Sequence, residues 1–267
     1  MFSVLMATYS GENPDYLREC LKSLQNQTFK PGEIVLVKDG PLSRELDCVI
    51  DEFKDLPFKI ILYLGNENLG GALRLGVEHC KFSIVARMDS DDIAASDRFE
   101  RQISFMNKYN VDVLGSAIEE FNESVGDIGR IRSGAKYPSK FDVSIKNPIS
   151  HMTVIFKKTI VLSSGNYIPL NGFEDWYLWL RAYDLGAKIM NQNDVLVYAR
   201  TNENFLNRRS GFKYAVQEYR TLRLFKKMKL ISTWYFFCGL CLRIPTRLFP
   251  SAILKKIYDN FLRTKKG

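Results

Sequence analysis

The sequence predicts an α/β fold, with a mostly parallel central sheet flanked by helices and a basic helical appendage at the C-terminus. Short apolar runs alternate with segments of helical periodicity, as is typical of consecutive strand–helix units. Several of these runs end in polar residues, as strands do at the carboxyl edge of a parallel sheet, where ligands bind. The appendage is predicted by charge. Residues 1–211 carry 25 Lys and Arg against 28 Asp and Glu (net −3), and residues 212–267 carry 13 against 2 (net +11).

The first half of the chain shows the alternation most clearly. Leu17, Cys20, Leu21 and Leu24, for example, recur at the spacing of one helix face. We expect strands over residues 3–9, 34–37, 59–63 and 82–88, and helices over residues 17–24, 46–53 and 68–80. Three cysteines fall on apolar helical positions, and we expect them to be small core residues: Cys20, Cys48 and Cys80.

The second half is less regular. We expect a helix over residues 97–109, a strand from residue 111, a strand over 151–156, a helix starting at 173 and a strand over 187–200. Residues 122–148 contain three glycines and two prolines with little periodicity. They therefore predict a long excursion that passes over the active site.

Three carboxylates follow the apolar run of residues 82–88 within four positions: Asp89, Asp91 and Asp92. In a strand, residues two apart point the same way, so Asp89 and Asp91 are expected to converge at the end of this strand. Oxygen-only ligation without His or Cys suits Mg²⁺ or Mn²⁺. The alternative is a helix N-cap, formed by Asp97 or by Asp92 itself.

The C-terminal segment combines basic residues with an apolar block. Residues 214–229 form a basic segment of helical period, and residues 230–242 are 13 positions without a charge. A membrane span needs roughly 20 apolar residues, so this block is too short to cross. Basic residues lie behind it, at Arg243, Arg247, Lys255 and Lys256. The segment predicts a helix lying in the membrane interface, with a helix packed on the preceding domain as the alternative.

Several motifs occur together in a characteristic order. They are Ser3–Tyr9, Val37–Gly40, Asn68–Gly71 followed by Arg74, Met88–Asp92, Arg98 with Gln102, His151, and Gly172–Asp175 leading into Trp179–Arg181. In these motifs the chain resembles the family 2 inverting glycosyltransferases with the A-type nucleotide-diphospho-sugar transferase fold, which is Rossmann-like. The similarity is to bacterial enzymes that build O-antigen, capsule, exopolysaccharide and lipopolysaccharide, and it covers roughly residues 2 to 202.

The resemblance implies a donor site for a nucleotide sugar. Thr8 and Tyr9 would border the base, and Asp39 would accept a hydrogen bond from the uracil imide. Asp91, with Asp89, would hold Mn²⁺ or Mg²⁺ against the diphosphate, and the metal would act as a Lewis acid on the departing nucleoside diphosphate. Further residues implied near the nucleotide or its phosphates are Asn68, Gly70, Arg74, Ser90, His151 and Arg200. Arg98 would be a supporting partner of the Asp cluster.

The resemblance also implies a general base. Inversion in one displacement needs a carboxylate that takes the proton of the acceptor hydroxyl. Asp175 is the preferred candidate. Its neighbour Glu174 would position the acceptor or serve the helix N-terminus, where acidic residues are favoured.

These observations lead to one expected function. Residues 1–211 would be the catalytic domain of a metal-dependent inverting hexosyltransferase, and residues 212–267 a membrane-associating appendage. The donor would be a UDP-hexose or UDP-N-acetylhexosamine, and the acceptor a lipid-linked oligosaccharide. Met1–Met6 has the pattern of a first strand and not of a signal peptide, and the cysteines form no disulfide framework. We therefore expect a cytoplasmic protein, peripheral on the inner face of the cell membrane.

Other functional classes fit less well. A sugar-phosphate nucleotidyltransferase needs a basic phosphate loop after the first strand, and residues 10–14 contain no Lys or Arg. A nicotinamide dehydrogenase needs a G-x-G-x-x-G after a strand, which is missing. A nucleic-acid-binding protein remains the alternative because of the basic tail. The aromatic residues of the tail cluster in the uncharged block, which suits lipid better, so no nucleic acid is expected.

Overall fold

The structure is a computed structural model that describes residues 1–65, 68–201, 210–248 and 264–265. Its strands are β1 (Ser3–Tyr9), β2 (Glu33–Asp39), β3 (Phe58–Tyr63), β4 (Ile84–Arg87), β5 (Ile93–Ala94), β6 (Val113–Phe121), β7 (Arg130–Arg132), β8 (Ile155–Lys157), β9 (Ile189–Arg200) and β10 (Thr264–Lys265). Its α-helices are α1 (Pro14–Gln25), α2 (Arg44–Glu52), α3 (Asn68–His79), α4 (Arg98–Tyr109), α5 (Lys140–Ile145), α6 (Lys158–Ser163), α7 (Glu174–Asp184), α9 (Phe212–Lys227) and α10 (Thr233–Leu248).

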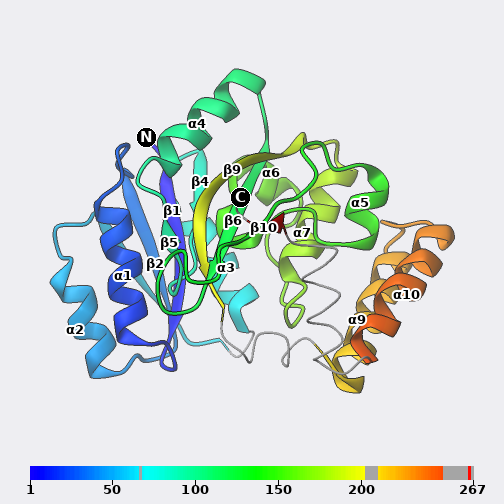
Figure 1. The fold of residues 1–267 in the computed structure, drawn as a ribbon, viewed down its shortest axis with the longest axis horizontal. Coiled ribbons are helices and arrows are strands. Elements are labelled where there is room, and N and C mark those ends of the chain that lie inside the picture. The colour runs from blue at the N-terminus through cyan, green and yellow to red at the C-terminus, as the bar shows by residue number, and fades with distance from the viewer. Residues whose placement is uncertain (66–67, 202–209, 249–263, 266–267) are drawn as a thin grey trace.

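The strands of the described residues form one 10-stranded sheet with helices on both faces (Figure 1). Neighbouring strands follow the order β10-β7-β6-β8-β4-β1-β2-β3, and β9 pairs with β6 and β5. The first four strands pair in parallel, as predicted. The later strands add antiparallel pairs, because β8 lies between β4 and β6 and runs against both. The fold class is confirmed, and the sheet as a whole is mixed.

The core lies on both faces of the sheet, as the alternation of side chains along β1 requires. Val4 and Met6 point into a cluster covered by α1, α2 and α4. Leu5 points into a second cluster that α3, α6 and α7 cover. Helix α3 approaches the sheet closely at Gly76, where an added Cβ would come within 2.3 Å of Leu5 Cδ1. A larger residue at position 76 would therefore separate this helix from the sheet.

Two local predictions were wrong. Residues His151–Thr153 form a short 3₁₀ helix, and the strand begins only at Ile155. The predicted excursion of residues 122–148 also contains regular structure, β7 and α5, and α5 begins with a capping box between Ser139 and Asp142. Cys48 is exposed on the outer face of α2, because the buried stripe of that helix is made by its neighbours at 46, 49 and 50.

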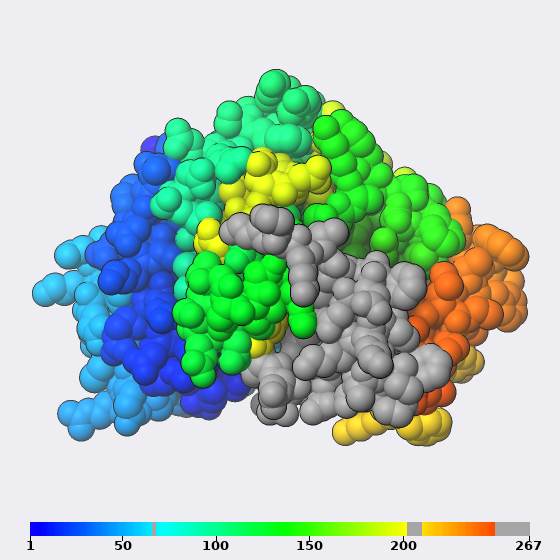
Figure 2. All heavy atoms as spheres, in the orientation of Figure 1, coloured from blue at the N-terminus to red at the C-terminus, as the bar shows by residue number. Residues whose placement is uncertain are grey.

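The two C-terminal helices pack on the body of the protein. Leu222 and Phe225 of α9 join a buried cluster with Trp176 and Tyr177 of α7. The surface of α10 (orange) lies at one edge of the molecule beside α5 (green) in Figure 2. None of the described helices is long and apolar enough to cross a membrane. Lys255 and Lys256, which were expected to add charge to this segment, lie outside the described residues.

Candidate functional site

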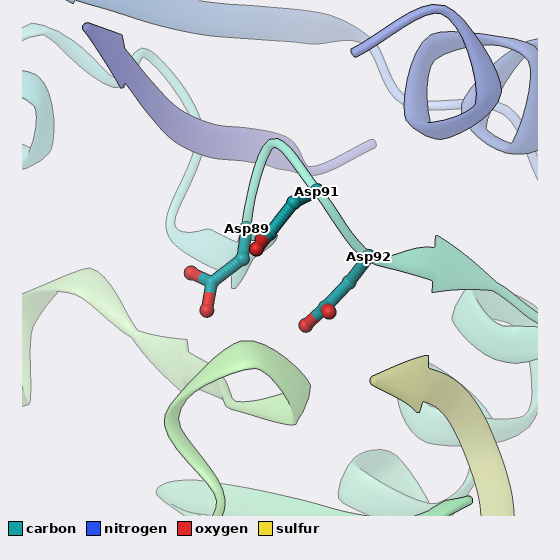
Figure 3. A group of neighbouring side chains, drawn as sticks. All are labelled: Asp89, Asp91 and Asp92. Atoms are coloured by element: carbon teal, nitrogen blue, oxygen red, sulfur yellow. The ribbon is translucent and has the colours of Figure 1, made fainter. Parts of the chain in front are cut away.

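Three carboxylates meet where the chain leaves β4. Oxygen atoms of Asp89, Asp91 and Asp92 all lie within 4.8 Å of one another (Figure 3). The turn that carries them, residues 88–92, is called the Asp turn below. It is anchored to β1, because Met88 N donates to Leu5 O at 3.0 Å. Asp92 does not cap a helix as the alternative supposed. Its Oδ1 accepts a hydrogen bond from Arg200 N at 2.8 Å, and Asp97, which precedes α4, makes no side-chain cap.

The electrostatics of this group favour a bound cation. Burial, followed by the charges of Asp89 and Glu12, raises the pKa of Asp91 to about 7. Burial and the two neighbouring carboxylates raise the pKa of Asp92 well above its usual value. The Oδ2 atom of Asp92 is buried without a hydrogen-bond partner among the described residues. Clustered carboxylate oxygens with one such atom fit a hard divalent ion such as Mg²⁺ or Mn²⁺.

A buried arginine lies beside the carboxylates. Arg87, at the end of β4, forms an ion pair with Asp89 and is 2% exposed. Arg98 contacts the backbone of Arg87, because Arg98 Nη2 donates to Arg87 O at 2.6 Å. Arg98 Nε donates to Gln102 Oε1 at 3.0 Å. Arg98 thus holds the strand end and does not touch the carboxylates. The sequence contained a signal for Arg87, because an arginine inside an apolar strand needs a buried carboxylate partner.

Arg200, for which the resemblance implied a place near the phosphates, is engaged by several protein groups, and the phosphate contact stays a prediction. The three guanidinium nitrogens of Arg200 donate to Asp91 O, Asn122 O and the carboxylate of Glu19. The guanidinium also lies 3.9 Å from the ring centroid of Tyr16 and 4.4 Å from that of Phe121. Protein groups therefore engage this side chain, which ties β9 and α1 to the Asp turn.

The ends of β1 and β2 lie side by side, as the predicted base site requires. Tyr9 pairs with Asp39 in the parallel register. Tyr9 is 54% exposed, whereas Thr8 is buried and its Oγ1 has no partner among the described residues. Burial raises the pKa of Asp39. This edge combines an accessible ring with a buried hydroxyl and a partly buried carboxylate, which suits recognition of a planar heterocycle.

At the start of α3, the backbone of Gly70 lies close to another part of the protein. Asn68 has a positive φ of 62° and accepts from Gly70 N at 3.1 Å. A Cβ on Gly70 would lie 3.0 Å from Pro169 Cα and 3.3 Å from Glu174 Cβ. The close approach at Gly70 is therefore to the chain before α7. Asn68, Gly70 and Arg74 do not line the cavity described next, which α3 reaches only through Leu69.

A cavity of about 510 Å³ lies between the Asp turn, the start of α7 and helix α10. Asp89, Glu174 and Asp175 line it, so the structure brings the candidate base and the Asp cluster to one space. Asn147 Nδ2 donates to Asp175 Oδ2. Glu174 Oε2 accepts from Gly172 N at 2.7 Å, which is a local structural contact. Ser90, which is buried, donates to Glu12 and stays outside the cavity lining.

His151 also lines the cavity, from the 3₁₀ helix that replaces the predicted strand. Its Nε2 lies 2.9 Å from the hydroxyl oxygen of Tyr167. Burial, followed by the charge of Arg87, lowers the pKa of His151 well below its usual value. A neutral imidazole therefore faces the same space as Asp89.

Four basic residues of the cavity were missed by the sequence reasoning: Arg132, Lys146, Arg243 and Arg247. They come from β7, the segment after α5, and α10. In the sequence, one pattern could have pointed to two of them: Arg243 and Arg247 lie four positions apart in a mostly apolar segment. That spacing puts both side chains on one helix face.

Comparison with known proteins extends these observations. The family model described as glycosyl transferase family 2 matches residues 3–166. An uncharacterized glycosyltransferase of Haemophilus influenzae is 39% identical over 98% of this chain and 99% of its own length. The amylovoran biosynthesis glycosyltransferase AmsE of Erwinia amylovora is also 39% identical, over 97% and 98%. An Escherichia coli protein named UDP-Gal:alpha-D-GlcNAc-diphosphoundecaprenol beta-1,3-galactosyltransferase is 35% identical, over 98% and 96%.

Solved structures show the same fold at low sequence identity. The mannosyltransferase PcManGT of Pyrobaculum calidifontis, in complex with GDP-Man and Mn²⁺, gives a TM-score of 0.67 at 14% identity over 97% of this chain and 75% of its own. Residues 1–349 of S. aureus TarS, in complex with UDP-GlcNAc, give 0.64 at 21% identity over 84% and 65%. The fold, the family model and the full-length relatives agree with the motifs, and the chain belongs to glycosyl transferase family 2.

Proposed function

We propose that the chain is a metal-dependent inverting glycosyltransferase of bacterial surface polysaccharide synthesis. It would transfer a hexose or N-acetylhexosamine from a UDP-sugar to a lipid-linked oligosaccharide. The observation that carries this proposal is that Asp89 of the acidic cluster and Asp175 line one cavity. Relatives named for amylovoran and O-antigen biosynthesis support the pathway class. The name of the galactosyltransferase relative specifies a UDP-sugar and a diphosphate-linked lipid.

The proposed chemistry divides between two groups of carboxylates. Asp89, Asp91 and Asp92 would hold Mn²⁺ or Mg²⁺, which supplies positive charge to the diphosphate of the leaving UDP. Asp175 would take the proton from the acceptor hydroxyl as the new bond forms. The hydrogen bond from Asn147 orients the Asp175 carboxylate within the cavity. Its other oxygen accepts from Trp176 N at 2.7 Å, so the carboxylate is held at the start of α7.

The donor nucleotide would lie along the edge formed by β1 and β2. Tyr9 would pack against the base, and Asp39 would accept from its imide. Thr8 would supply a hydroxyl for which the described residues provide no partner. Each of the three is placed by the parallel register of two strands that are buried in the core.

A thermal-shift panel of nucleotides with and without Mn²⁺ tests the donor proposal. We expect UDP to raise Tm only with Mn²⁺, by about 5 to 10 °C at 100 times its Kd. GDP and ADP should give smaller shifts. Asp91→Asn should remove the metal-dependent part, and Asp51→Asn, which changes an exposed carboxylate on α2, should leave it unchanged. A full UDP shift in Asp91→Asn would contradict the metal assignment.

We also propose that α10 rests on the inner face of the cell membrane. Trp234, Phe237 and Leu242 are 71%, 54% and 54% exposed and follow one side of the helix. Exposed Lys227 and Lys229 lie just before it. An apolar helix face bordered by lysines is typical of interfacial binding to anionic lipid.

Vesicle sedimentation tests the membrane contact. The double variant Trp234→Ser/Phe237→Ser should weaken partitioning to phosphatidylglycerol vesicles more than about 10-fold. The reason is that burial of each apolar side chain in the membrane would contribute roughly 1.5 to 3 kcal/mol of binding free energy. Tyr109→Ser on α4 is the matched control and should bind as the parent does. Tighter binding to a DNA or RNA oligonucleotide than to the vesicles would favour the nucleic-acid alternative instead.

A further inference from the structure

Arg87, the last residue of β4, is a buried arginine in direct contact with the carboxylates of the Asp turn. It is 2% exposed and forms an ion pair with Asp89. Its Nη1 donates to Met88 O, and its Nε has no hydrogen-bond partner among the described residues. Burial of an arginine costs free energy of desolvation, which a single ion pair offsets only in part. Stability alone is therefore a weak reason for a cation at this position.

Two other arginines lie near the Asp turn, and both bond elsewhere. Arg98 donates to Arg87 O and to Gln102 Oε1. Arg200 donates to two backbone oxygens and pairs with Glu19. Both add positive charge near the cluster without contacting its carboxylate oxygens. Within the described part of the chain, Arg87 is therefore the cation that forms an ion pair with a carboxylate of this cluster.

His151 and Tyr167 also lie within reach of the charge of Arg87. The Nε2 atom of His151 is 2.9 Å from the hydroxyl oxygen of Tyr167. Burial, followed by the charge of Arg87, lowers the pKa of His151, and burial raises the pKa of Tyr167. Both groups are therefore uncharged at pH 7. They cannot replace Asp89 as the ionic partner of Arg87.

The charge of Arg87 would act with opposite signs on a metal ion and on a nucleotide. The three carboxylates of the Asp turn, which gather on one side of it (Figure 3), would attract a divalent cation. Arg87 would repel that cation and compete with it for Asp89, which is 27% exposed and lines the cavity. A diphosphate carries negative charge, so the same guanidinium would attract it.

We propose that Arg87 is a positioning residue that balances the charge of the Asp turn between metal and nucleotide. In the nucleotide-free protein it holds the carboxylate of Asp89 and weakens the binding of a divalent ion. When a nucleoside diphosphate binds, the positive charge of Arg87 stabilises it. The ion is therefore held mainly together with the nucleotide and only weakly by the protein alone. This inference rests on the proposed function and adds a residue that sets the affinities for both ligands.

Manganese binding to the metal-free full chain tests the effect on the metal. Electron paramagnetic resonance measures the free Mn²⁺ that remains after each addition. We expect Arg87→Met to bind Mn²⁺ at least about 10-fold more tightly than the parent, because one nearby positive charge is removed. Arg87→Lys keeps the charge and should stay within about threefold of the parent. Arg101→Met, which removes an exposed arginine from α4, should bind as the parent does.

Titration of UDP at saturating Mn²⁺ tests the effect on the nucleotide. UDP should bind at least about 10-fold more weakly to Arg87→Met than to the parent. A variant with a damaged site would lose affinity for both ligands, whereas loss of the Arg87 charge predicts tighter Mn²⁺ and weaker UDP. Equal or weaker Mn²⁺ binding in Arg87→Met would overturn the inference, and so would unchanged UDP affinity.

Two comparisons separate the possible failures. A parent chain that binds Mn²⁺ but no UDP would refute the proposed function, and the role of Arg87 with it. A parent that binds both ligands, with an Arg87→Met variant that does not change as stated, would refute the role of Arg87 alone.

A second pair of variants covers the case in which Arg87→Met fails to fold, since breaking a buried ion pair is destabilising. Asp89→Asn leaves the charge of Arg87 without its partner, and the double variant Arg87→Met/Asp89→Asn removes both charges. The double variant should bind Mn²⁺ at least about 10-fold more tightly than Asp89→Asn, through the carboxylates of Asp91 and Asp92. Equal or weaker binding in the double variant would overturn the inference.

Discussion

Asp92, in the Asp turn, is buried, lies beside two other carboxylates and has one oxygen atom without a hydrogen-bond partner among the described residues. It is 2% exposed, and two further carboxylates lie within 4.8 Å. Its hydrogen bond from Arg200 N satisfies Oδ1, while Oδ2 has no partner among the described residues. In the metal-free protein an ionised Asp92 is therefore a cost, and in the proposed metal complex it becomes a ligand.

The first prediction concerns Asp92→Asn, which keeps an acceptor for Arg200 N and removes the charge. The folded pKa of Asp92 is raised above its unfolded value, so ionisation lowers stability at every pH above about 4. In metal-free buffer at pH 7.5 we expect Tm to rise by roughly 2 to 4 °C, as about 1 kcal/mol gives in a domain of this size. The gain should vanish near pH 4. Mn²⁺-dependent stabilisation by UDP should be lost, and its retention would remove Asp92 from the metal site.

The second prediction concerns Asp175→Asn. The change removes the base and keeps the oxygen that accepts from Trp176 N. With a working acceptor we expect kcat to fall roughly 10²- to 10⁴-fold, the usual contribution of a general base, and UDP affinity to stay the same. Glu174→Gln preserves the bond from Gly172 N and should cost less than about 10-fold. Near-parental turnover in Asp175→Asn would show that another group takes the proton.

At the scale of elements, β9 and α1 meet the Asp turn through Arg200. Its guanidinium lies between the rings of Tyr16 and Phe121 and donates to Asp91 O. The side chain is 6% exposed, so these contacts are shielded from water. The position of Asp91 therefore depends on a strand that ends 109 residues further along the chain.

The third prediction is that Arg200→Lys weakens Mn²⁺-dependent UDP binding about 10-fold, although the Arg200 side chain reaches Asp91 through its backbone oxygen and not through its carboxylate. An ammonium group cannot stack on two rings and also reach three acceptors. The lysine variant therefore loses the contacts that hold the Asp turn against β9 and α1. Calorimetric titration of UDP with Mn²⁺ measures the effect. Arg101→Lys, which changes the exposed pairs with Asp97 and Asp194, is the control. Unchanged UDP affinity in Arg200→Lys would contradict this positioning role.

At the scale of the whole molecule, the cavity depends on both parts of the chain. Its floor comes from the Asp turn and α7, and part of its wall from α10. The buried cluster of Phe173, Trp176 and Tyr177 with Leu222 and Phe225 joins these parts. The boundary at residue 211 remains a prediction, and the shared cluster argues that neither part is stable alone.

The fourth prediction is that a chain ending at residue 211 fails to fold stably. Without α9 and α10, the faces of α5 and α7 would expose a large apolar patch, which promotes aggregation. We expect low soluble yield, strong binding of the dye ANS and a Tm well below that of the full chain. Within the full chain, Phe225→Ala should cost roughly 3 to 5 kcal/mol, and Phe237→Ala, at an exposed site, less than about 0.5 kcal/mol. A soluble, cooperatively unfolding fragment would establish residues 1–211 as an independent domain.

The sequence by itself determined the α/β class and the parallel direction of the first strands. Both features depend on local periodicity, because the spacing of apolar residues shows which face of a helix or strand each residue occupies. Asp89 and Asp91 meet as predicted, but they do so in the turn after β4 and not through the two-residue repeat of a strand. Periodicity also predicted that Tyr9 and Asp39 would share an edge, because parallel strands align their carboxyl ends. The motif order identified the family, which the comparisons confirmed.

Only the tertiary structure decided which distant elements complete the site. Asp92 joins the carboxylates because Arg200 on β9 holds it, and Arg243 and Arg247 reach the cavity because α10 packs beside α5. Both contacts connect residues about 100 positions apart. No local pattern encodes such contacts, since they follow from how helices and strands pack once their apolar faces are buried.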